Sequence, residues 1–261
     1  MIKKHLIVDV KKRDIDSEHY KIWRYMSIEK FLYLIMNRKL YMSQAAAFND
    51  PYEGVVSDSI RYSEKAGKSE QEVEEIRDKY NKYQKEAKKC YVSCWHINQN
   101  ENVAMWKLYA DEKSGVAIQS KIGNLIKSMN CKKKKKSDIT MYLGKVKYMN
   151  FNYEQDHDYN GDEFEQDHDY NGDEFEISEI VDVLFYKRFE FGGENELRLV
   201  KEYDSKIENN GYEVDVNLEA LIEKIYVSPT APEYYRDIVE GLLKKYNYEF
   251  EVVQSSDLLK H

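Results

Sequence analysis

The sequence predicts an α+β protein that folds as a single domain, residues 1–261, with a central mixed or antiparallel sheet flanked by helices. Short runs of β-branched and aromatic residues are interspersed with amphipathic stretches, which predicts both strands and helices. These segments do not alternate strictly as strand, helix and strand, and such an order is typical of α+β folds. No linker divides the 261 residues, which are enough to bury a substantial core.

The first predicted unit is WRYMSIEKFLYLIMNRKLYMSQAAAFNDPYEG, residues 23–54. A short strand is followed by Ser27, which we expect to cap a helix because its hydroxyl can accept an N–H of the first turn. The apolar face of this helix has helical spacing and consists of Ile28, Phe31, Leu32 and Ile35. A second strand around Tyr41 leads to a turn with three polar side chains, Asn49, Asp50 and Glu53. We predict that this unit forms a pocket wall, and an ordinary polar turn is the alternative.

The remaining elements follow from the same patterns of hydrophobicity and turn residues. Further strands are predicted at residues 2–10, 90–95, 115–118, 144–148, 194–200, 212–216, 225–227 and 248–253. Further helices are predicted at residues 63–89, after Asn102, at 122–129, at 218–225 and from Pro232 onward. The helix at 63–89 is very polar apart from a thin apolar stripe and carries a capping box of Ser69 and Glu72, so we expect an outer or lid helix.

Charge is distributed unevenly along the chain. The net charge is −8, but residues 154–176 hold 11 acids and no Lys or Arg, so the remainder carries +3. Residues 154–164 (EQDHDYNGDEF) are repeated identically at 165–175, which predicts an acidic, duplicated surface loop. Each copy contains half of a calcium loop, but neither has the bidentate Glu at the twelfth position, so a loop without calcium is favoured. Five lysines at 132–136 indicate a solvated loop, with a phosphate or nucleic-acid contact as the alternative.

The location expected from the sequence is the cytoplasm. No signal peptide is recognised at the N-terminus, and no apolar run reaches the ~20 residues that span a bilayer. Three cysteines in a chain of this length do not form a disulfide framework. Cys90, Cys94 and His96 lack a second close ligand pair, so no zinc site is predicted. No glycine-rich nucleotide-binding loop is present.

Two carboxylates at Glu194 and Glu196 are the strongest chemical signal in the chain. Side chains two apart on a strand share a face, and paired carboxylates push each other's pKa values apart. Such a pair can also stabilise the oxocarbenium-like centre that forms when a glycosidic bond breaks. The alternative is a charged edge strand in which the acids pair with Arg198 or Lys187.

Five motifs together identify the chain as a member of a widespread bacterial family of uncharacterised cytosolic proteins, several of which are found near phage-defence genes. They are YMSIEKFLYLIMNRKLYMSQAAAFNDPYEG (25–54), YVSCWHINQNENVAMWKLYA (91–110), GVAI (115–118), FYKRFEFGGENELRLV (185–200) and KIYVSPTAP (224–232). The resemblance covers nearly the whole chain, apart from the acidic loop, but it implies no particular activity.

The layout of the segments also resembles that of ADP-ribosyltransferases. In those folds an Arg or His on the first strand is followed by a Ser motif on a middle strand and then by a strand opened by Glu-x-Glu. The resemblance implies that Arg24 anchors a phosphate or ribose of NAD and that Ser93 orders the pocket. It further implies that Glu196 stabilises the cation formed as nicotinamide leaves, and that Glu194 positions the acceptor.

These observations give one set of predicted site residues and three functional hypotheses. Catalytic roles are predicted for Glu196, Glu194 and Arg24, and no metal site is predicted. Ligand-binding roles are predicted for Arg24, Ser27, Tyr41, Asn49, Asp50, Glu53, Ser93, Trp95, Trp106 and Arg188. The first hypothesis is an NAD-consuming or ADP-ribosylating effector that acts on an unidentified protein or nucleic-acid acceptor, without a membrane partner. The others are a metal-dependent nuclease or hydrolase, and a non-enzymatic sensor that binds a ligand or protein.

Overall fold

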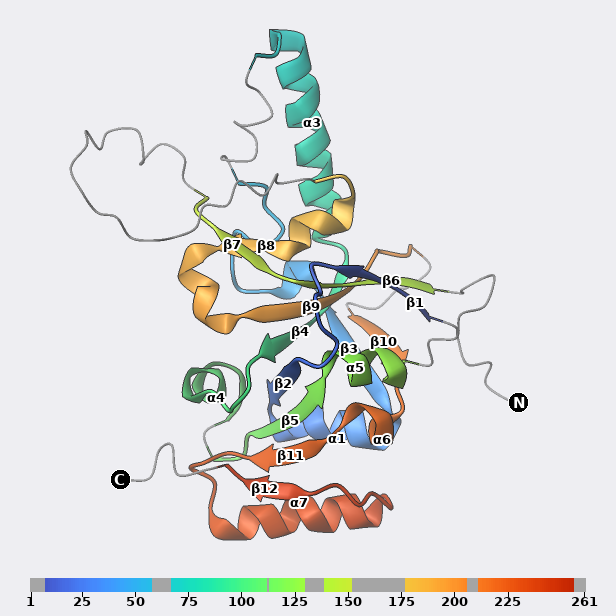
Figure 1. The fold of residues 1–261 in the computed structure, drawn as a ribbon, viewed down its shortest axis with the longest axis vertical. Helices are drawn as coiled ribbons and strands as arrows, with labels where there is room; N and C mark the ends of the chain where they lie inside the picture. The colour runs from blue at the N-terminus through green and yellow to red at the C-terminus, as the bar shows by residue number, and fades with distance from the viewer. Residues whose placement is uncertain are drawn as a thin grey trace, which may run out of the picture.

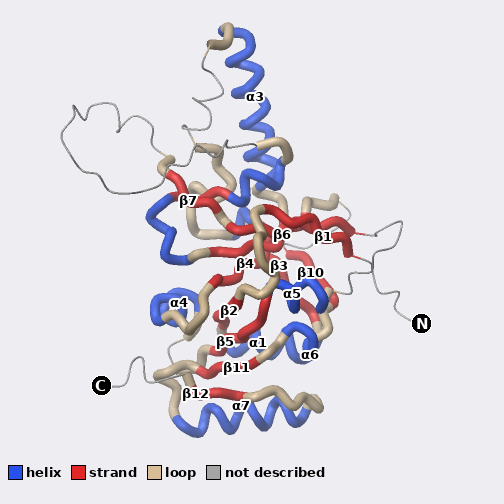
Figure 2. Tube along the Cα trace, viewed as in Figure 1, coloured by secondary structure: helices blue, strands red, loops and turns tan. Residues whose placement is uncertain are grey.

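The computed structural model describes residues 8–57, 67–111, 113–129, 139–151, 177–205 and 211–255. A mixed sheet occupies the middle of the molecule and helices lie around it, which confirms the predicted α+β class (Figures 1 and 2). The acidic repeat at 154–176 and the lysine run at 132–136 lie outside the described residues. In the part of the chain that is described, no helix combines the length and apolar character needed to cross a membrane.

The large sheet of the described residues has ten strands, and its main path runs β1-β6-β9-β4-β2-β5-β11-β12. Its strands are β1 (Val8–Arg13), β2 (Lys21–Met26), β3 (Lys39–Gln44), β4 (Tyr91–Ile97), β5 (Val116–Lys121), β6 (Ile139–Lys145), β9 (Glu196–Lys201), β10 (Gly211–Asp215), β11 (Lys224–Val227) and β12 (Val252–Gln254). The pairs β1–β6 and β11–β12 are parallel and the other pairs are antiparallel. A second, two-stranded parallel sheet joins β7 (Lys147–Met149) and β8 (Tyr186–Arg188).

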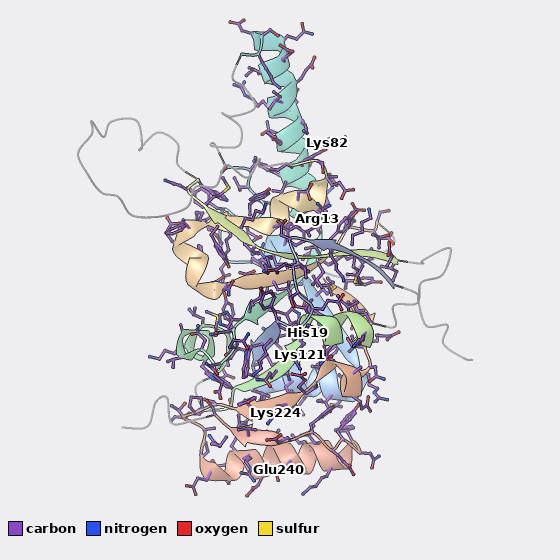
Figure 3. The ribbon with its side chains drawn as sticks, in the orientation of Figure 1. Arg13, His19, Lys82, Lys121, Lys224 and Glu240 are labelled. Atoms are coloured by element: carbon purple, nitrogen blue, oxygen red, sulfur yellow. The ribbon has the colours of Figure 1, made fainter. Side chains whose placement is uncertain are left out.

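The helices lie along the flanks and at the two ends of the sheet (Figure 1). They are α1 (Ile28–Asn37), α3 (Glu70–Ala87), α4 (Val103–Tyr109), α5 (Ile122–Ser128), α6 (Leu218–Leu221) and α7 (Glu233–Lys245), with 3₁₀ turns η1 (Ala45–Ala47), η3 (Ile180–Phe185) and η4 (Phe189–Glu194). The helix α3 projects from the body at the end opposite α7, and Lys82 points outward from it (Figure 3). Its predicted capping box between Ser69 and Glu72 is present. Only Tyr80 and Ala87 of this helix are buried, because its sequence offers only a thin apolar stripe.

The sheet splits at the strand β4. One edge of β4 pairs with β9 along its length, from Tyr91 to His96. The other edge pairs with β3 only at Val92 and Tyr91, and with β2 only at Ile97 and His96. The strands β2 and β3 therefore diverge from one another beside the middle of β4, and α1 connects them.

The two faces of β4 have different surroundings, because successive strand residues point to opposite faces. Tyr91, Trp95 and Ile97 belong to the largest apolar core, which α1 joins through Phe31, Leu34 and Ile35. Val92 packs on the opposite face in a second core around η3, and Cys94 lies against that core. A third, small core of Trp23, Tyr25, Met105, Trp106 and Ala117 holds α4 on the sheet.

Several predicted boundaries differ from the structure. The strand predicted at 194–200 starts only at Glu196, because Glu194 ends the turn η4 and Asn195 adopts a left-handed conformation with φ 39°. The strand predicted at 144–148 is two strands, β6 and β7. The helix predicted at 218–225 ends at Leu221. Ser27 occupies the predicted N-cap position of α1, but its hydroxyl accepts no N–H of the first turn.

Candidate functional site

A cleft of about 1200 Å³ opens where β2 and β3 diverge from β4. Its walls come from β2, α1, β3, the turn that follows η1, β4, α4, β8, η4 and β9. The volume exceeds the range of roughly 300–1000 Å³ that is typical of sites for small molecules, so the cleft has room for a ligand of nucleotide or dinucleotide size.

One side of the cleft holds a buried ionic cluster, which we define as Glu53, Lys187, Glu194, Glu196 and Arg198. Lys187 Nζ donates to both carboxylates of the pair, to Glu194 Oε2 and, at 2.7 Å, to Glu196 Oε1. Arg198 Nε donates to Glu196 Oε2 at 2.6 Å, and its two Nη atoms make a bidentate pair with Glu53. All five side chains are buried. Because three acids face two bases, the cluster carries an excess of one negative charge when every member is ionised.

The pKa values of the Glu194 and Glu196 carboxylates are shifted in opposite directions. Burial raises the pKa of Glu194, and the approach of Glu196 adds to this effect. Burial opposes ionisation of Glu196 too, but Arg198 and Lys187 outweigh it and hold the pKa of Glu196 well below its usual value. The environment thus moves the pKa values of the two carboxylates apart, which is the pattern of sites where two carboxylates take different roles.

The helix α4 contributes Tyr109 to the cluster, a residue that the sequence did not single out. Its hydroxyl donates to Glu194 Oε1 at 2.7 Å, while 47% of the residue remains exposed. Beneath it, the His96 ring joins the main-chain carbonyl of Glu194 to the side chain of Asn102, whose oxygen caps α4 at Ala104 N. Burial lowers the pKa of His96, so the ring is neutral at pH 7 and donates from Nδ1 to that carbonyl.

The other side of the cleft contains Arg24, Ser93 and Trp95, which the strand register places on the face of the sheet that α1 covers. Arg24 donates to the carbonyl of Tyr41 at 2.9 Å and so bridges β2 and β3. Its guanidinium lies over the Trp95 ring at 5.7 Å, and it makes no ion pair with a carboxylate of the described residues. Desolvation lowers the pKa of Arg24 to about 10. Ser93 Oγ and Trp95 Nε1 are buried and have no hydrogen-bond partner among the described residues.

The turn FNDPYEG, residues 48–54, lines the cleft and is held at two points. Asp50 accepts from Arg188 Nη2 at 3.1 Å and from the Tyr52 amide at 3.0 Å. The Arg188 guanidinium lies between the rings of Tyr52 and Phe191, at 4.6 and 5.1 Å from their centroids. The turn is therefore fixed at one end by this stacked pair and at the other by the Glu53–Arg198 pair.

Most of the predicted site residues line this one cleft. Those that do are Arg24, Tyr41, Asn49, Asp50, Glu53, Ser93, Trp95, Arg188, Glu194 and Glu196. Ser27 does not line it, because it sits at the start of α1 and hydrogen-bonds Glu29. Trp106 does not line it either, since its ring packs edge-on against Tyr25 at 5.0 Å and its Nε1 donates to Glu101. From the sequence, Arg198 was considered only as a partner of the acids, Lys187 as such a partner or as part of a hydrolase site, and Tyr109 was given no role.

The four acids predicted for the site are already paired with cations. Asp50 pairs with Arg188, Glu53 with Arg198, Glu194 with Lys187, and Glu196 with both Lys187 and Arg198. Within the described ranges, no group of three or more His, Cys, Asp or Glu side chains is arranged to hold a metal ion. The geometry therefore offers no support for the metal-dependent hydrolase.

Fold and site together define an α+β protein with a nucleotide-sized cleft and a buried pair of carboxylates. Residues 105–199 match the model of a protein family described as a protein of unknown function (DUF2971). The matched span runs from α4 to β9 and contains Tyr109, Lys187 and both carboxylates of the pair, whereas Arg24 and Ser93 precede it. No curated protein matches the chain.

Proposed function

We propose that the cleft binds NAD, breaks the bond between nicotinamide and ribose, and transfers ADP-ribose to water or to an acceptor. The observation that carries this proposal is the buried pair of Glu194 and Glu196 in a cleft of dinucleotide size. Lys187 joins the two carboxylates, and their pKa values are shifted in opposite directions. Breaking a glycosidic bond creates positive charge on the sugar, and two carboxylates with different protonation are the usual means of assisting it.

The excess charge of the ionic cluster suits this chemistry. With every member ionised, the cluster is one negative charge in excess, and the ribose gains positive charge as nicotinamide leaves. Aromatic side chains at the mouth, such as Tyr41, Tyr109 and Phe191, offer flat surfaces on which the nicotinamide or adenine ring can stack. The resemblance to ADP-ribosyltransferases noted in the sequence supports the same reaction. A cytoplasmic effector encoded near phage-defence genes is the biological setting that we propose with it.

Measuring NAD consumption tests this proposal directly. Purified protein should release nicotinamide from NAD, alone or with cell lysate as a source of acceptor, and NAD should raise its melting temperature. A double variant, Glu194→Gln with Glu196→Gln, should release none. Glu190→Gln is a matched control, because Glu190 lies on the same turn η4 but is exposed. Absence of both nicotinamide release and an NAD-dependent rise in melting temperature would rule the function out.

A further inference from the structure

Glu196 is fully engaged by neighbouring cations. One oxygen accepts from Lys187 at 2.7 Å and the other from Arg198 at 2.6 Å. Arg198 is 0% exposed and is held in turn by Glu53 and by the carbonyl of Leu184 at 2.7 Å. Glu196 thus lies at the centre of the ionic cluster and accepts hydrogen bonds from two buried cations. An arrangement of this kind fixes positions, because each member would be left buried and unpaired without the others.

Glu194 is held in a different way. It shares Lys187 with Glu196, no arginine of the described residues binds it, and its other oxygen accepts from the hydroxyl of Tyr109 at 2.7 Å. Tyr109 stands at the cleft with about half of its surface exposed, so a ligand can reach this oxygen by displacing a single phenol. The left-handed residue Asn195 also separates Glu194 from the strand and presents it from the end of η4.

The helix α4 helps to hold both the carboxylate and the main chain of Glu194. Tyr109 holds the carboxylate, and the His96–Asn102 link connects the main chain of Glu194 to the N-cap of the same helix. The helix itself is anchored in the small core through Met105 and Trp106. The position of Glu194 is therefore set by α4, whereas the position of Glu196 is set by the ionic cluster.

We propose that Glu194, oriented by Tyr109, is the carboxylate that meets the substrate, and that Glu196 is a positioning residue that acts through Lys187 and Arg198. This assignment rests on the proposed function. It keeps Glu194 on the side of the acceptor, as the sequence resemblance implies, but gives Glu196 no direct contact with the cation. In the reaction, the bond between ribose C1′ and nicotinamide breaks, and its electron pair neutralises the ring nitrogen. The attacking hydroxyl forms the new C1′–O bond and gives its proton to the Glu194 carboxylate, which then releases it to solvent.

The titration behaviour of the pair agrees with this division. A carboxylate with a raised pKa is the stronger proton acceptor near neutral pH, and the pKa of Glu194 is raised while that of Glu196 is lowered. The Tyr109 hydroxyl opposes that rise, so its removal should raise the pKa of Glu194 further. The titratable and charged groups that face Glu194 are Lys187 of β8, Glu196 of β9, Tyr109 of α4, His96 of β4 and Tyr148 of β7.

Four variants separate the two roles: Glu194→Gln, Glu196→Gln, Tyr109→Phe and the control Glu190→Gln. We expect Glu194→Gln to melt close to the wild type and to release nicotinamide about 100-fold more slowly, as for loss of a general base. We expect Glu196→Gln to melt about 5 °C lower or more, because it disrupts a buried ionic cluster. Tyr109→Phe should keep its fold and shift the acid limb of the pH–rate profile to higher pH, and Glu190→Gln should match the wild type throughout.

Three results would overturn the assignment. Glu194→Gln could keep most of the nicotinamide release, Glu196→Gln could melt like the wild type while losing release, or Tyr109→Phe could leave the pH profile unmoved. Wild-type protein without nicotinamide release would instead refute the proposed function. In that case the melting temperatures alone test the different roles of the two acids, since Glu196→Gln must destabilise the fold and Glu194→Gln must not.

Discussion

The two sides of the cleft differ in how completely their polar groups are paired. In the ionic cluster, three acids and two bases satisfy one another within the protein. On the α1 side, Arg24 has no acid partner within the described ranges, and Ser93 and Trp95 have buried donors that find no hydrogen bond there. A buried polar group without a partner costs free energy, so a protein retains it only where something other than folding requires it.

This difference separates polar groups that are paired within the protein and stabilise the fold from groups that can bind a ligand. The ionic cluster ties the FNDPYEG turn, β8, η4 and β9 together, and its charges are bound before any ligand arrives. The groups on the α1 side are donors, which complement an acceptor-rich group such as the diphosphate of NAD. Apart from Glu194, substitutions in the cluster should therefore act mainly on stability, and substitutions on the α1 side mainly on binding.

The largest effect is expected from Arg198→Met. It leaves buried Glu53 without its cation and Glu196 with Lys187 alone, so we expect the free energy of unfolding to fall by about 3–5 kcal/mol. Arg236→Met is the control, because its pair with Glu240 is largely exposed and should be worth about 0.5 kcal/mol. Urea denaturation of both variants measures the difference. Equal stability of the two variants would show that the cluster does not hold the fold together.

The next effect concerns the pH dependence of stability. The pKa of Glu196 is lowered from an ordinary value of 4.5, so its stabilising contribution is present above pH 4.5 and is lost as the pH falls below that value. The pKa of Glu194 is raised from 4.5, so its contribution is present below pH 4.5 and is lost as the pH rises through the folded-state value. Melting temperatures should therefore be measured from pH 3 to pH 8. We expect them to depend less on pH in the acid range for Glu196→Gln, and less on pH in the range above it for Glu194→Gln. The opposite pattern in the two variants would contradict the directions of both pKa shifts.

A smaller effect on stability is expected from Ser93→Ala. The Ser93 hydroxyl is buried without a partner, so its removal should leave the free energy of unfolding unchanged or raise it by up to about 1 kcal/mol. Ser128→Ala is a matched control, since Ser128 is equally buried but donates to the carbonyl of Leu125 at 2.7 Å, and it should lose about 1 kcal/mol. Calorimetry of both variants checks this, and a loss for Ser93→Ala as large as for Ser128→Ala would mean that the hydroxyl is bonded in the free protein.

The sequence could predict what depends on neighbouring residues. The caps at Ser69 and Asn102, the first β-α-β unit and most strands follow from local patterns, and all are present. The α+β class followed from the order of those elements. Glu194 was placed wrongly on a strand, because nothing in an alternating charged and apolar run signals the left-handed turn at Asn195.

The architecture of the cleft depends on distant pairings that no local pattern contains. The divergence of β2 and β3 is set by which residues of β4 each one pairs with. The contact of Tyr109 with Glu194 joins residues 85 positions apart. For the same reason Trp106 was expected in the cleft, although an aromatic residue on α4 can equally face the small core. The sequence therefore located the walls of the cleft and the pairing of the two acids with Lys187 and Arg198, but not the contacts of Tyr109 and Glu53.

The smallest effect on stability and a large effect on binding are expected from Arg24→Gln. Within the described residues Arg24 bonds only the Tyr41 carbonyl and stacks on Trp95, so its loss should change the free energy of unfolding by no more than about 1 kcal/mol. A charge-assisted hydrogen bond to a phosphate contributes about 1.5–3 kcal/mol, so the affinity for NAD should fall by about 10-fold or more. Isothermal titration with NAD and with inorganic pyrophosphate measures this, with Arg236→Gln as the exposed control. Unchanged affinity in Arg24→Gln would remove the distinction between the two sides, because a cation that has no acid partner among the described residues would then serve neither folding nor binding.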